Sequence, residues 1–558
     1  MWRSRLIFTF FLLWFFLVIG KLFYWQVLSY NKLAAAADKQ HFISFTLPAL
    51  RGDILASDGS ILVTNQPAYL VWAEPPKVEG KKRLTDVLSN VLKMPQASVS
   101  AILDTSNALW VPLARRIDED TVNTLKQQNL AGIGFEKMGK RYYPEASMSA
   151  QILGFVASDN IGDDKGYFGI EGSYDKELRG RDGFLRQEKD PYGFPIVIGE
   201  GERIDPENGR NVVLHIDKIV QNSIETKLKK GIEKFGAKAG SIIVMEPATG
   251  AILGMASYPS YDQSSFSEYD KELYKNPTVA TSYEPGSTFK SIVMASAISE
   301  KVVTPQTETD EEGPVKISGY EIRTWDNKYR GRINMTEILQ HSSNVGMVFV
   351  GEKLGKDKFL DYLEKFGFGQ STGIDLSDEQ VPNLRPVNQW REIDLATATF
   401  GQGIAVTPIQ MIRAVAVLAN GGKLVEPHIV SKIIDSFGNE TEIKPKVIRQ
   451  VITPHGSKVI TEMLVQSVIG GEAHYKIPKG YRIAGKTGTA QIPVAGHYDE
   501  QKTIASFVGY APADNPKFVM LVTITEPTSS PWGSETAAPL FMDITSDLLA
   551  YYKIFPSP

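Results

Sequence analysis

An uncharged apolar segment near the start of the chain limits what the rest of the sequence can form. Two arginines precede the uncharged run from Leu6 to Gly20, and bulky aromatic residues follow it as far as Trp25. Counting from Leu6 to Trp25 gives 20 residues, enough for a helix to cross a bilayer. The sequence therefore predicts one membrane-spanning helix over residues 6–26, after a cytoplasmic tail of residues 1–5.

A cleaved signal peptide is the alternative to this anchor, because a 15-residue apolar run also fits the core of such a signal. However, Lys21 and three aromatic residues separate the run from the small-residue stretch Ala34–Ala37. The arginines ahead of the run favour a cytoplasmic N-terminus, although three later lysines weaken that bias. We expect an uncleaved anchor in the cytoplasmic (inner) membrane, with the body of the protein on the extracytoplasmic side.

Length and composition bound the remaining possibilities. A chain of 558 residues, 42% hydrophobic and 22% charged, is expected to fold into two or three globular domains. Its net charge of -4 does not favour nucleic acid as a partner, because phosphate binding needs clustered Lys and Arg. The absence of cysteine excludes disulfides and thiolate catalysis, and the seven histidines lack zinc-hydrolase spacing.

Two folded regions are predicted after the anchor. The first, residues 40–210, combines strand, helix and loop patterns. Its expected elements are a strand at 42–47, a turn at Asp58-Gly59, mainly helix from about 80 to 130, a loop at 159–172, a short helix at 174–178 and an extended, irregular stretch at 179–209.

The second region, residues 211–555, is predicted to be an α+β domain. Asp217 can cap a helix with an apolar residue at every fourth position, and a β-hairpin follows that helix. Further expected elements are the hairpin strands at 241–246 and 251–257, two apolar strands at 504–510 and 518–525, and a helix at 537–552. We expect a mostly antiparallel sheet whose last strands follow Lys486.

The first chemical motif is Ser287-Thr288-Phe289-Lys290. Pro285-Gly286 ends a loop before it, and an apolar run typical of a buried helix follows. Ser287 is then expected at the helix N-terminus, with Lys290 one turn later on the same face, where a neutral amine can take the serine proton. Ser173-Tyr174-Asp175-Lys176 matches the same pattern but lacks the following helix, so we reject it.

The second motif is Ser342-Ser343-Asn344, 55 residues after Ser287. It lies between a helical stretch and an apolar run, and it offers a hydroxyl for proton relay and an amide that can hold a lysine and a substrate carbonyl. Ser158-Asp159-Asn160 is a second candidate. It precedes the nucleophile in a Gly- and Asp-rich loop, so order and context favour Ser342.

The third motif is Lys486-Thr487-Gly488-Thr489, 199 residues after Ser287. Glycine leaves room beside a strand edge for a ligand backbone. The lysine and the threonine hydroxyls can attract a carboxylate, and a strand-edge N–H can stabilise an oxyanion. Each motif alone is a weak signal, so the three in this order carry the inference.

In this order the motifs resemble those of the penicillin-binding proteins and class A β-lactamases. The chain is most similar to class B penicillin-binding proteins, the monofunctional D,D-transpeptidases that cross-link peptidoglycan. Arg51–Ile54 and Gly169–Gly180 are similar to N-terminal motifs of that family. Tyr283–Lys290 and Ala484–Gln491 resemble the division-associated septal and sporulation branch. One departure is Ser343, where many relatives in the wider superfamily carry Asp.

The resemblance implies an elongated, mixed α/β N-terminal dimerisation or pedestal domain and a C-terminal penicillin-binding, serine β-lactamase-like transpeptidase domain. It implies that a serine attacks the penultimate D-alanine of a stem peptide, expels the terminal D-alanine and passes the acyl group to a neighbouring amine. The implied catalytic residues are Ser287, Lys290, Ser342, Asn344 and Lys486, and the implied substrate-binding residues are Thr487, Gly488 and Thr489.

The same resemblance implies D-Ala-D-Ala stem peptides and β-lactams as ligands, no metal or organic cofactor, and a membrane-embedded glycan polymerase with other divisome or elongasome proteins as partners. Elongation-type cross-linking and a non-catalytic division scaffold or β-lactam sensor are the alternatives to septal synthesis. A β-lactamase is a further rival, because Glu379 and Asn383 have a spacing that superficially suits water activation.

Overall fold

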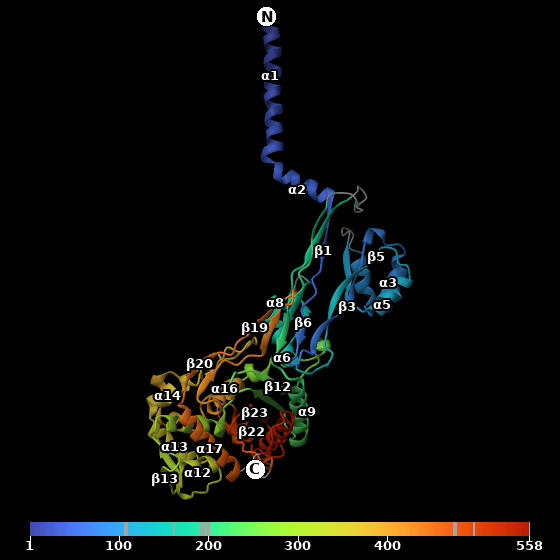
Figure 1. The fold of residues 1–558 in the computed structure, drawn as a ribbon. Helices are drawn as coiled ribbons and strands as arrows, with labels where there is room; N and C mark the ends of the chain where they lie inside the picture. The colour runs from blue at the N-terminus through green and yellow to red at the C-terminus, as the bar shows by residue number, and fades with distance from the viewer. Residues whose placement is uncertain are drawn as a thin grey trace. The chain divides into compact units, whose positions relative to one another are not determined.

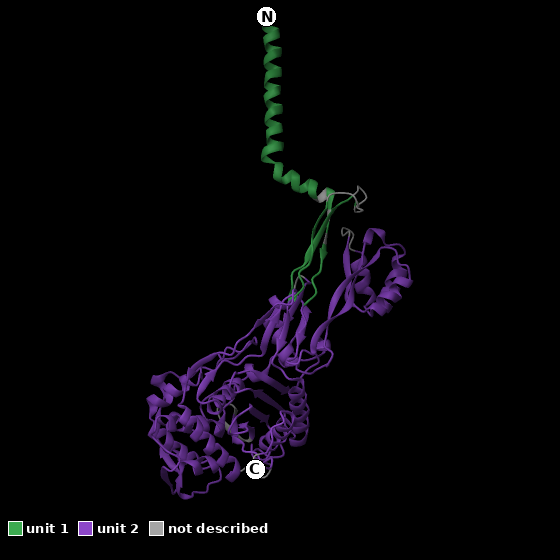
Figure 2. Cartoon of the chain, in the orientation of Figure 1, with its two compact units in different colours: residues 1–51, 179–209 green, residues 52–178, 210–558 purple. Residues whose placement is uncertain are grey.

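The computed structural model describes residues 1–104, 110–159, 162–189, 196, 201–471, 477–494 and 497–556. The chain divides into two compact units, coloured separately in Figure 2. The first comprises residues 1–51 and 179–209, and the second comprises residues 52–178 and 210–558. The second unit therefore contains residues from both sides of the boundary predicted near Asn211, and that boundary stays a prediction.

The first unit begins with one long apolar helix. α1 (Trp2–Phe23) continues into the π-helical turn η1 (Tyr24–Leu28), and together these 27 residues are long and apolar enough to cross a membrane. At about 1.5 Å per residue the helix is roughly 40 Å long, more than the hydrocarbon thickness of about 30 Å. α2 (Tyr30–His41) follows it.

A three-stranded antiparallel sheet completes the first unit. Its order is β1-β8-β9, formed by β1 (Phe42–Leu47), β8 (Gly183–Glu188) and β9 (Gly201–Ile204). The predicted strand at 42–47 is confirmed. In the described part of the stretch 179–209, which was predicted to be extended and irregular, β8 and β9 are regular strands.

A larger sheet in the second unit joins segments that are distant in sequence. Its order is β19-β18-β10-β2-β3-β4, with β5 also paired to β3. The strands are β2 (Ile54–Leu55), β3 (Ile61–Ala73), β4 (Val111–Ile117), β5 (Ile133–Tyr142), β10 (Asn211–Leu214), β18 (Val430–Ile434) and β19 (Glu440–Glu442). The predicted turn at Asp58-Gly59 connects β2 to β3, and Gly59 has the positive φ that such a turn favours.

Helices α3 (Lys81–Leu92), α4 (Gln96–Leu103) and α5 (Glu119–Gln127) pack on β3 and β4 around one apolar cluster. The prediction of mainly helix from 80 to 130 is wrong for β4, because that segment is held by pairing with β3. The predicted loop at 159–172 is also partly wrong: β7 (Asp164–Tyr167) pairs with β6 (Phe155–Ser158), and α7 (Gly169–Ser173) follows.

A buried ion pair in the second unit links Glu171 of one N-terminal motif, through Arg141, to Gly52 of the other. Arg141 of β5 donates to Glu171 of α7, with Nε and Oε1 2.7 Å apart, and to the carbonyl oxygen of Gly52 at 2.7 Å. The side chains of Arg141 and Glu171 are 5% and 0% exposed. Because a charge buried at this depth needs a partner, Glu171 and Arg141 depend on each other, and the hydrogen bond to Gly52 links the pair to the backbone of the first motif.

A five-stranded antiparallel sheet forms the centre of the C-terminal part. Its order is β12-β11-β23-β22-β21, and its strands are β11 (Ala239–Met245), β12 (Ile252–Tyr258), β21 (Ala484–Val494), β22 (His497–Ala511) and β23 (Phe518–Thr525). The pairing of β11 with β12 and of β22 with β23 confirms the predicted hairpin and the two predicted late strands. Side chains of these strands alternate between the two buried faces of the sheet.

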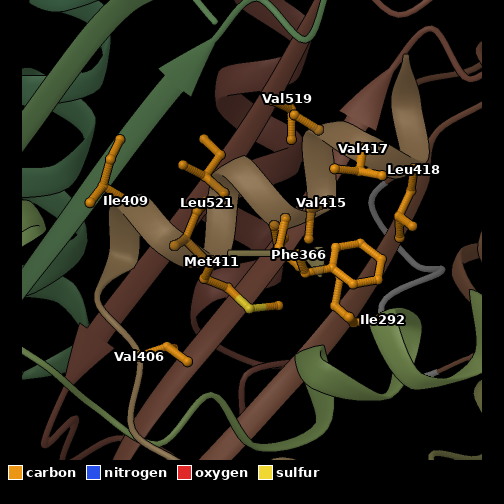
Figure 3. Close-up of a cluster of buried hydrophobic side chains, with 14 of the residues drawn as sticks. Ile292, Phe366, Val406, Ile409, Met411, Val415, Val417, Leu418, Val519 and Leu521 are labelled. Atoms are coloured by element: carbon orange, nitrogen blue, oxygen red, sulfur yellow. The ribbon is translucent and has the colours of Figure 1, made fainter. Parts of the chain in front are cut away.

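Helices cover both faces of this sheet. α9 (Lys218–Phe235) and α18 (Ala537–Tyr551) pack on one face, and α9 lies beside the sheet in Figure 1. Asp217 accepts hydrogen bonds from the N–H groups of Ile219 and Val220, so the predicted helix cap is confirmed. On the other face, Figure 3 shows side chains of α16 (Pro408–Ala419) gathered with Ile292 and Leu521.

The described residues contain further helices and strands, besides those whose bounds are given with the candidate site and in the sections that follow it. They are η2 (Pro75–Lys77), α6 (Ala150–Leu153), α8 (Asp175–Arg179), η3 (Gln263–Glu268), η4 (Lys271–Tyr274), α10 (Pro277–Ala280), β14 (Val315–Ile317), β15 (Tyr320–Ile322), α14 (Lys356–Lys365), η6 (Val387–Gln389), α15 (Glu392–Ala398), β17 (Lys423–Val425), β20 (Val447–Gln450) and α17 (Pro454–Gly470).

Two facing histidines make the stability of the fold depend on pH. The rings of His215 and His428 lie 4.9 Å apart, centroid to centroid, and burial followed by the charge of His428 lowers the pKa of His215 to about 4. Because the folded-state pKa lies below the usual value of about 6.5, the neutral ring stabilises the fold above pH 6.5. That stability is lost as the pH falls from about 6.5 to about 4.

We predict that the His215→Gln protein loses less stability between pH 7 and pH 4 than the wild-type protein does. The difference should reach about 2 kcal/mol, because partial exposure of the ring screens part of the full effect. Urea denaturation at several pH values measures it, and His455→Gln, at an exposed position, is the matched control. An unchanged pH dependence in the His215→Gln protein would contradict the prediction.

Candidate active site

Ser287 lies in a short turn that leads directly into a buried helix. The 3₁₀ turn η5 (Gly286–Phe289) precedes α11 (Lys290–Ser299), so the α-helix begins three residues later than Ser287. Gly286 has φ +55°, and a Cβ there would lie 2.9 Å from the carbonyl oxygen of Thr489. A residue without a side chain is therefore needed for the turn to approach β21 closely.

Lys290 connects the first motif to the second. Its side chain is completely buried, and its Nζ lies 2.5 Å from the carbonyl oxygen of Ser342, 3.3 Å from Ser342 Oγ and 2.8 Å from Asn344 Oδ1. Asn344 is itself oriented by donating from Nδ2 to the carbonyl oxygen of Arg323 at 2.9 Å. The predicted proximity of the amine, the hydroxyl and the amide is therefore present in the structure.

The second motif joins two helices, as its sequence context predicted. α12 (Met335–Gln340) ends before Ser342, and α13 (Asn344–Leu354) begins after Ser343, which caps it. Ser342 has φ +54°, a left-handed conformation that is unfavourable for a residue with a side chain. Such backbone strain persists only where surrounding contacts hold it. The contacts of the segment between α12 and α13 are therefore needed to keep Ser342 in this conformation.

The third motif forms part of the edge strand β21. Lys486 is 2% exposed, and its Nζ lies 3.1 Å from Thr487 Oγ1 and 3.2 Å from the carbonyl oxygen of Thr487. A Cβ at Gly488 would lie 2.4 Å from Ser506 Oγ and 2.7 Å from Thr288 Cγ2. Glycine is thus required here by the packing of β21 against the Ser287 turn and β22.

All three motifs meet at one cleft of about 240 Å³. Its lining includes Gly286, Ser287, Trp325, Ser342, Asn344, Phe400, Gln402, Thr487, Gly488, Thr489, Gln491, Thr503, Pro531 and Trp532. Lys290 and Lys486 are buried and contact residues of this lining. The arrangement places a serine hydroxyl, two amines, a second hydroxyl and a strand edge around a space that can hold a peptide end.

Two tryptophans on the cleft were not predicted from the sequence. Trp325 and Trp532 stack edge to face with ring centroids 5.1 Å apart, and both are partly exposed. Trp325 is fixed by donating from Nε1 to the carbonyl oxygen of His341 at 3.1 Å. They come from separate loops without a recognisable motif, so only the fold brings them to the site.

Burial sets the protonation of two groups beside the motifs. It raises the pKa of the Tyr283 hydroxyl, which therefore stays protonated at neutral pH. Burial, with a smaller contribution from the charge of Arg330, lowers the pKa of His341 below its usual value, so that ring is neutral at pH 7.

The competing motifs lie elsewhere. Ser173 ends α7 beside Tyr174, whose hydroxyl donates to Asp375 at 3.1 Å, and it does not line the cleft. Asn160 of the alternative Ser158 motif lies outside the described residues. Glu379 accepts hydrogen bonds from the backbone N–H and the hydroxyl of Thr372 at 2.7 and 2.6 Å, so it holds its own loop rather than the cleft.

Comparison with known proteins identifies the family. The model of the penicillin-binding protein transpeptidase domain matches residues 240–546, and that of the penicillin-binding protein dimerisation domain matches residues 46–214. The chain belongs to the penicillin-binding proteins. The combination of these two domains confirms the resemblance to class B members that the motifs indicated.

Relatives of this penicillin-binding protein match along nearly its whole length. Stage V sporulation protein D of Bacillus subtilis (strain 168) is 33% identical, over 99% of this chain and 86% of the relative. The peptidoglycan D,D-transpeptidase FtsI of Escherichia coli (strain K12) is 30% identical, over 100% of this chain and 92% of the relative.

Solved structures confirm the predicted fold class. A peptidoglycan synthetase from Bifidobacterium adolescentis superposes with a TM-score of 0.75 at 26% identity, covering 93% of this chain and 98% of the other. Penicillin binding protein 3 from Mycobacterium tuberculosis, complexed with aztreonam, gives a TM-score of 0.72 at 25% identity, covering 92% of this chain and 98% of the other.

Proposed function

We propose that this penicillin-binding protein is a peptidoglycan D,D-transpeptidase that cross-links stem peptides through an acyl-enzyme on Ser287. The observation that carries the proposal is the meeting of all three motifs at one cleft, with the buried amine of Lys290 in contact with the second motif. The names of relatives that span the whole chain support the same activity.

The acylation step uses the first two motifs. Ser287 Oγ attacks the carbonyl carbon of the penultimate D-alanine while neutral Lys290 takes the hydroxyl proton. Backbone N–H groups of Ser287 and Thr489 stabilise the oxyanion that forms. When the peptide bond breaks, Ser342, assisted by Lys486, passes a proton to the departing amine of the terminal D-alanine. The product is an ester on Ser287.

The transfer step runs in the opposite direction. An amine of a neighbouring stem peptide attacks the ester carbonyl and loses its proton to the same relay, which restores the Ser287 hydroxyl. During both steps Asn344 positions the substrate amide. During acylation Thr487, Gly488 and Thr489 bind the terminal carboxylate, which then leaves with the expelled D-alanine. A β-lactam ring opens on the same serine, because its amide carbonyl takes the place of the peptide carbonyl.

The proposed arrangement in the cell follows from the apolar helix. Residues 1–5 form a cytoplasmic tail and residues 6–26 cross the cytoplasmic membrane. Residues 40–210 are the pedestal domain and residues 211–555 are the extracytoplasmic transpeptidase domain. The length and apolar character of Trp2–Leu28 support the span. The ranges of the two family models support the order of the domains.

Septal synthesis is the proposed setting, with a membrane-embedded glycan polymerase and other division proteins as partners. The sporulation and FtsI names of relatives favour this branch over elongation. A fluorescent fusion imaged in dividing cells separates the two settings: midcell enrichment supports the septal role, and a pattern along the side wall contradicts it.

The activity itself is tested on the purified full chain in detergent, with a D-Ala-D-Ala-type thioester donor and a D-amino acid acceptor. The proposal expects transfer to the acceptor in the wild-type protein and none in the Ser287→Ala protein. Bound penicillin should be released slowly after one equivalent has reacted. Rapid, repeated hydrolysis of penicillin would instead indicate a β-lactamase.

A further inference from the structure

A buried carboxylate lies beside the second motif without a role in the steps above. Glu311 ends β13 (Glu308–Glu311) and is completely buried. Its Oε1 accepts a hydrogen bond from Ser343 Oγ, and its Oε2 is buried without a hydrogen-bond partner among the described residues. Burying a carboxylate with an unpaired oxygen is unfavourable, so its position needs an explanation other than packing.

Ser343 connects this carboxylate to the residues around Lys290. The Ser343 hydroxyl donates to Glu311 and accepts from the backbone N–H of Gly346 at 2.9 Å, so both of its hydrogen-bonding directions are used. Its neighbours in sequence, Ser342 and Asn344, both contact Lys290 Nζ. Fixing the side chain of Ser343 therefore fixes the segment that presents both contacts.

The backbone of this segment needs such support. Ser342 has φ +54°, and its backbone N–H reaches the Leu339 carbonyl oxygen only at 3.3 Å. Glu311 is well placed to hold it, because β13 pairs with β16 (Gly331–Asn334), which leads directly into α12. Glu311 is thus connected, through the pairing of β13 with β16, to the strand that precedes α12, and α12 leads to the second motif.

We propose that Glu311 is a positioning residue for acylation: its carboxylate holds Ser343, and through Ser343 it keeps Ser342 and Asn344 in contact with Lys290. This role rests on the proposed function, because its consequence is the rate at which Ser287 is acylated. The carboxylate acts as a hydrogen-bond acceptor, so an amide oxygen at the same position preserves most of the effect.

The test compares acylation of the full chain by a fluorescent penicillin in Glu311→Ala, Ser343→Ala, the double variant and Glu311→Gln. The two single alanine variants should each be acylated about tenfold more slowly, with initial penicillin binding unchanged. The double variant should be no slower than the slower single variant, because both remove the same interaction. Glu311→Gln should stay within about threefold of wild type.

Glu312→Ala, an exposed neighbour, is the matched control and should be acylated at the wild-type rate. The proposal is overturned if Glu311→Ala is acylated normally, if the losses of the two single variants multiply in the double variant, or if Glu311→Gln is as slow as Glu311→Ala. If Glu311→Ala does not fold by thermal melting, Ser343→Ala decides alone, and a wild-type rate in that variant overturns the proposal. Failure of wild type to be acylated would instead contradict the proposed function.

Discussion

Replacing Lys290 with methionine is expected to slow acylation by penicillin by roughly a thousandfold, the middle of the range that general bases contribute. The substitution keeps the length of a buried side chain but removes the nitrogen that contacts both Ser342 and Asn344. Ser287 would then lose the amine that the proposal assigns to take its proton. Stopped-flow or gel measurement of the acylation rate with a fluorescent penicillin gives the effect.

Lys301→Met is the matched control for this prediction, because Lys301 follows the same helix but is exposed. Its acylation rate should equal that of wild type. Thermal melting of both variants separates a chemical effect from unfolding, since Lys290→Met also leaves buried acceptors without a donor. A folded Lys290→Met protein acylated within tenfold of wild type would exclude Lys290 as the base.

Glu171→Ala is expected to destabilise the fold by about 3–5 kcal/mol, because it leaves the charge of Arg141 buried without its partner. The pair is almost fully buried, with side chains 5% and 0% exposed, and Arg141 also holds the Gly52 carbonyl oxygen. Urea denaturation of the purified chain measures the loss. Acylation per folded molecule should change little, because neither residue lines the cleft.

The control for this prediction is the exposed pair of Lys365 and Asp361, one helical turn apart with side chains 38% and 45% exposed. Removing it by Asp361→Ala should cost less than about 1 kcal/mol. If Glu171→Ala destabilised the protein no more than Asp361→Ala does, the buried ion pair would not hold the two N-terminal motifs together.

Much of the C-terminal fold could be predicted because local signals agreed with the tertiary structure. Asp217 caps its helix, the sheet strands have apolar side chains on both faces, and α12 and α13 flank the second motif where the residue pattern placed them. Segment β4 was missed because its conformation depends on pairing with β3, which no local pattern reveals.

The candidate site was predictable only where residues form motifs. Ser287, Ser342 and Lys486 each belong to a short pattern, and their order in the chain indicated a shared site. Trp325 and Glu311 carry no such signal, since a lone aromatic or acidic residue is ordinarily part of a surface or turn. Their place beside the motifs comes from long-range packing, which the sequence expresses only through the whole fold.

Mass spectrometry of peptides from the penicillin-treated full chain identifies the serine that is acylated. We predict one covalent penicilloyl adduct, located on the peptide that carries Ser287, and no adduct in the Ser287→Ala protein. An adduct on any other serine, Ser173 included, or continued labelling of the Ser287→Ala protein would contradict it.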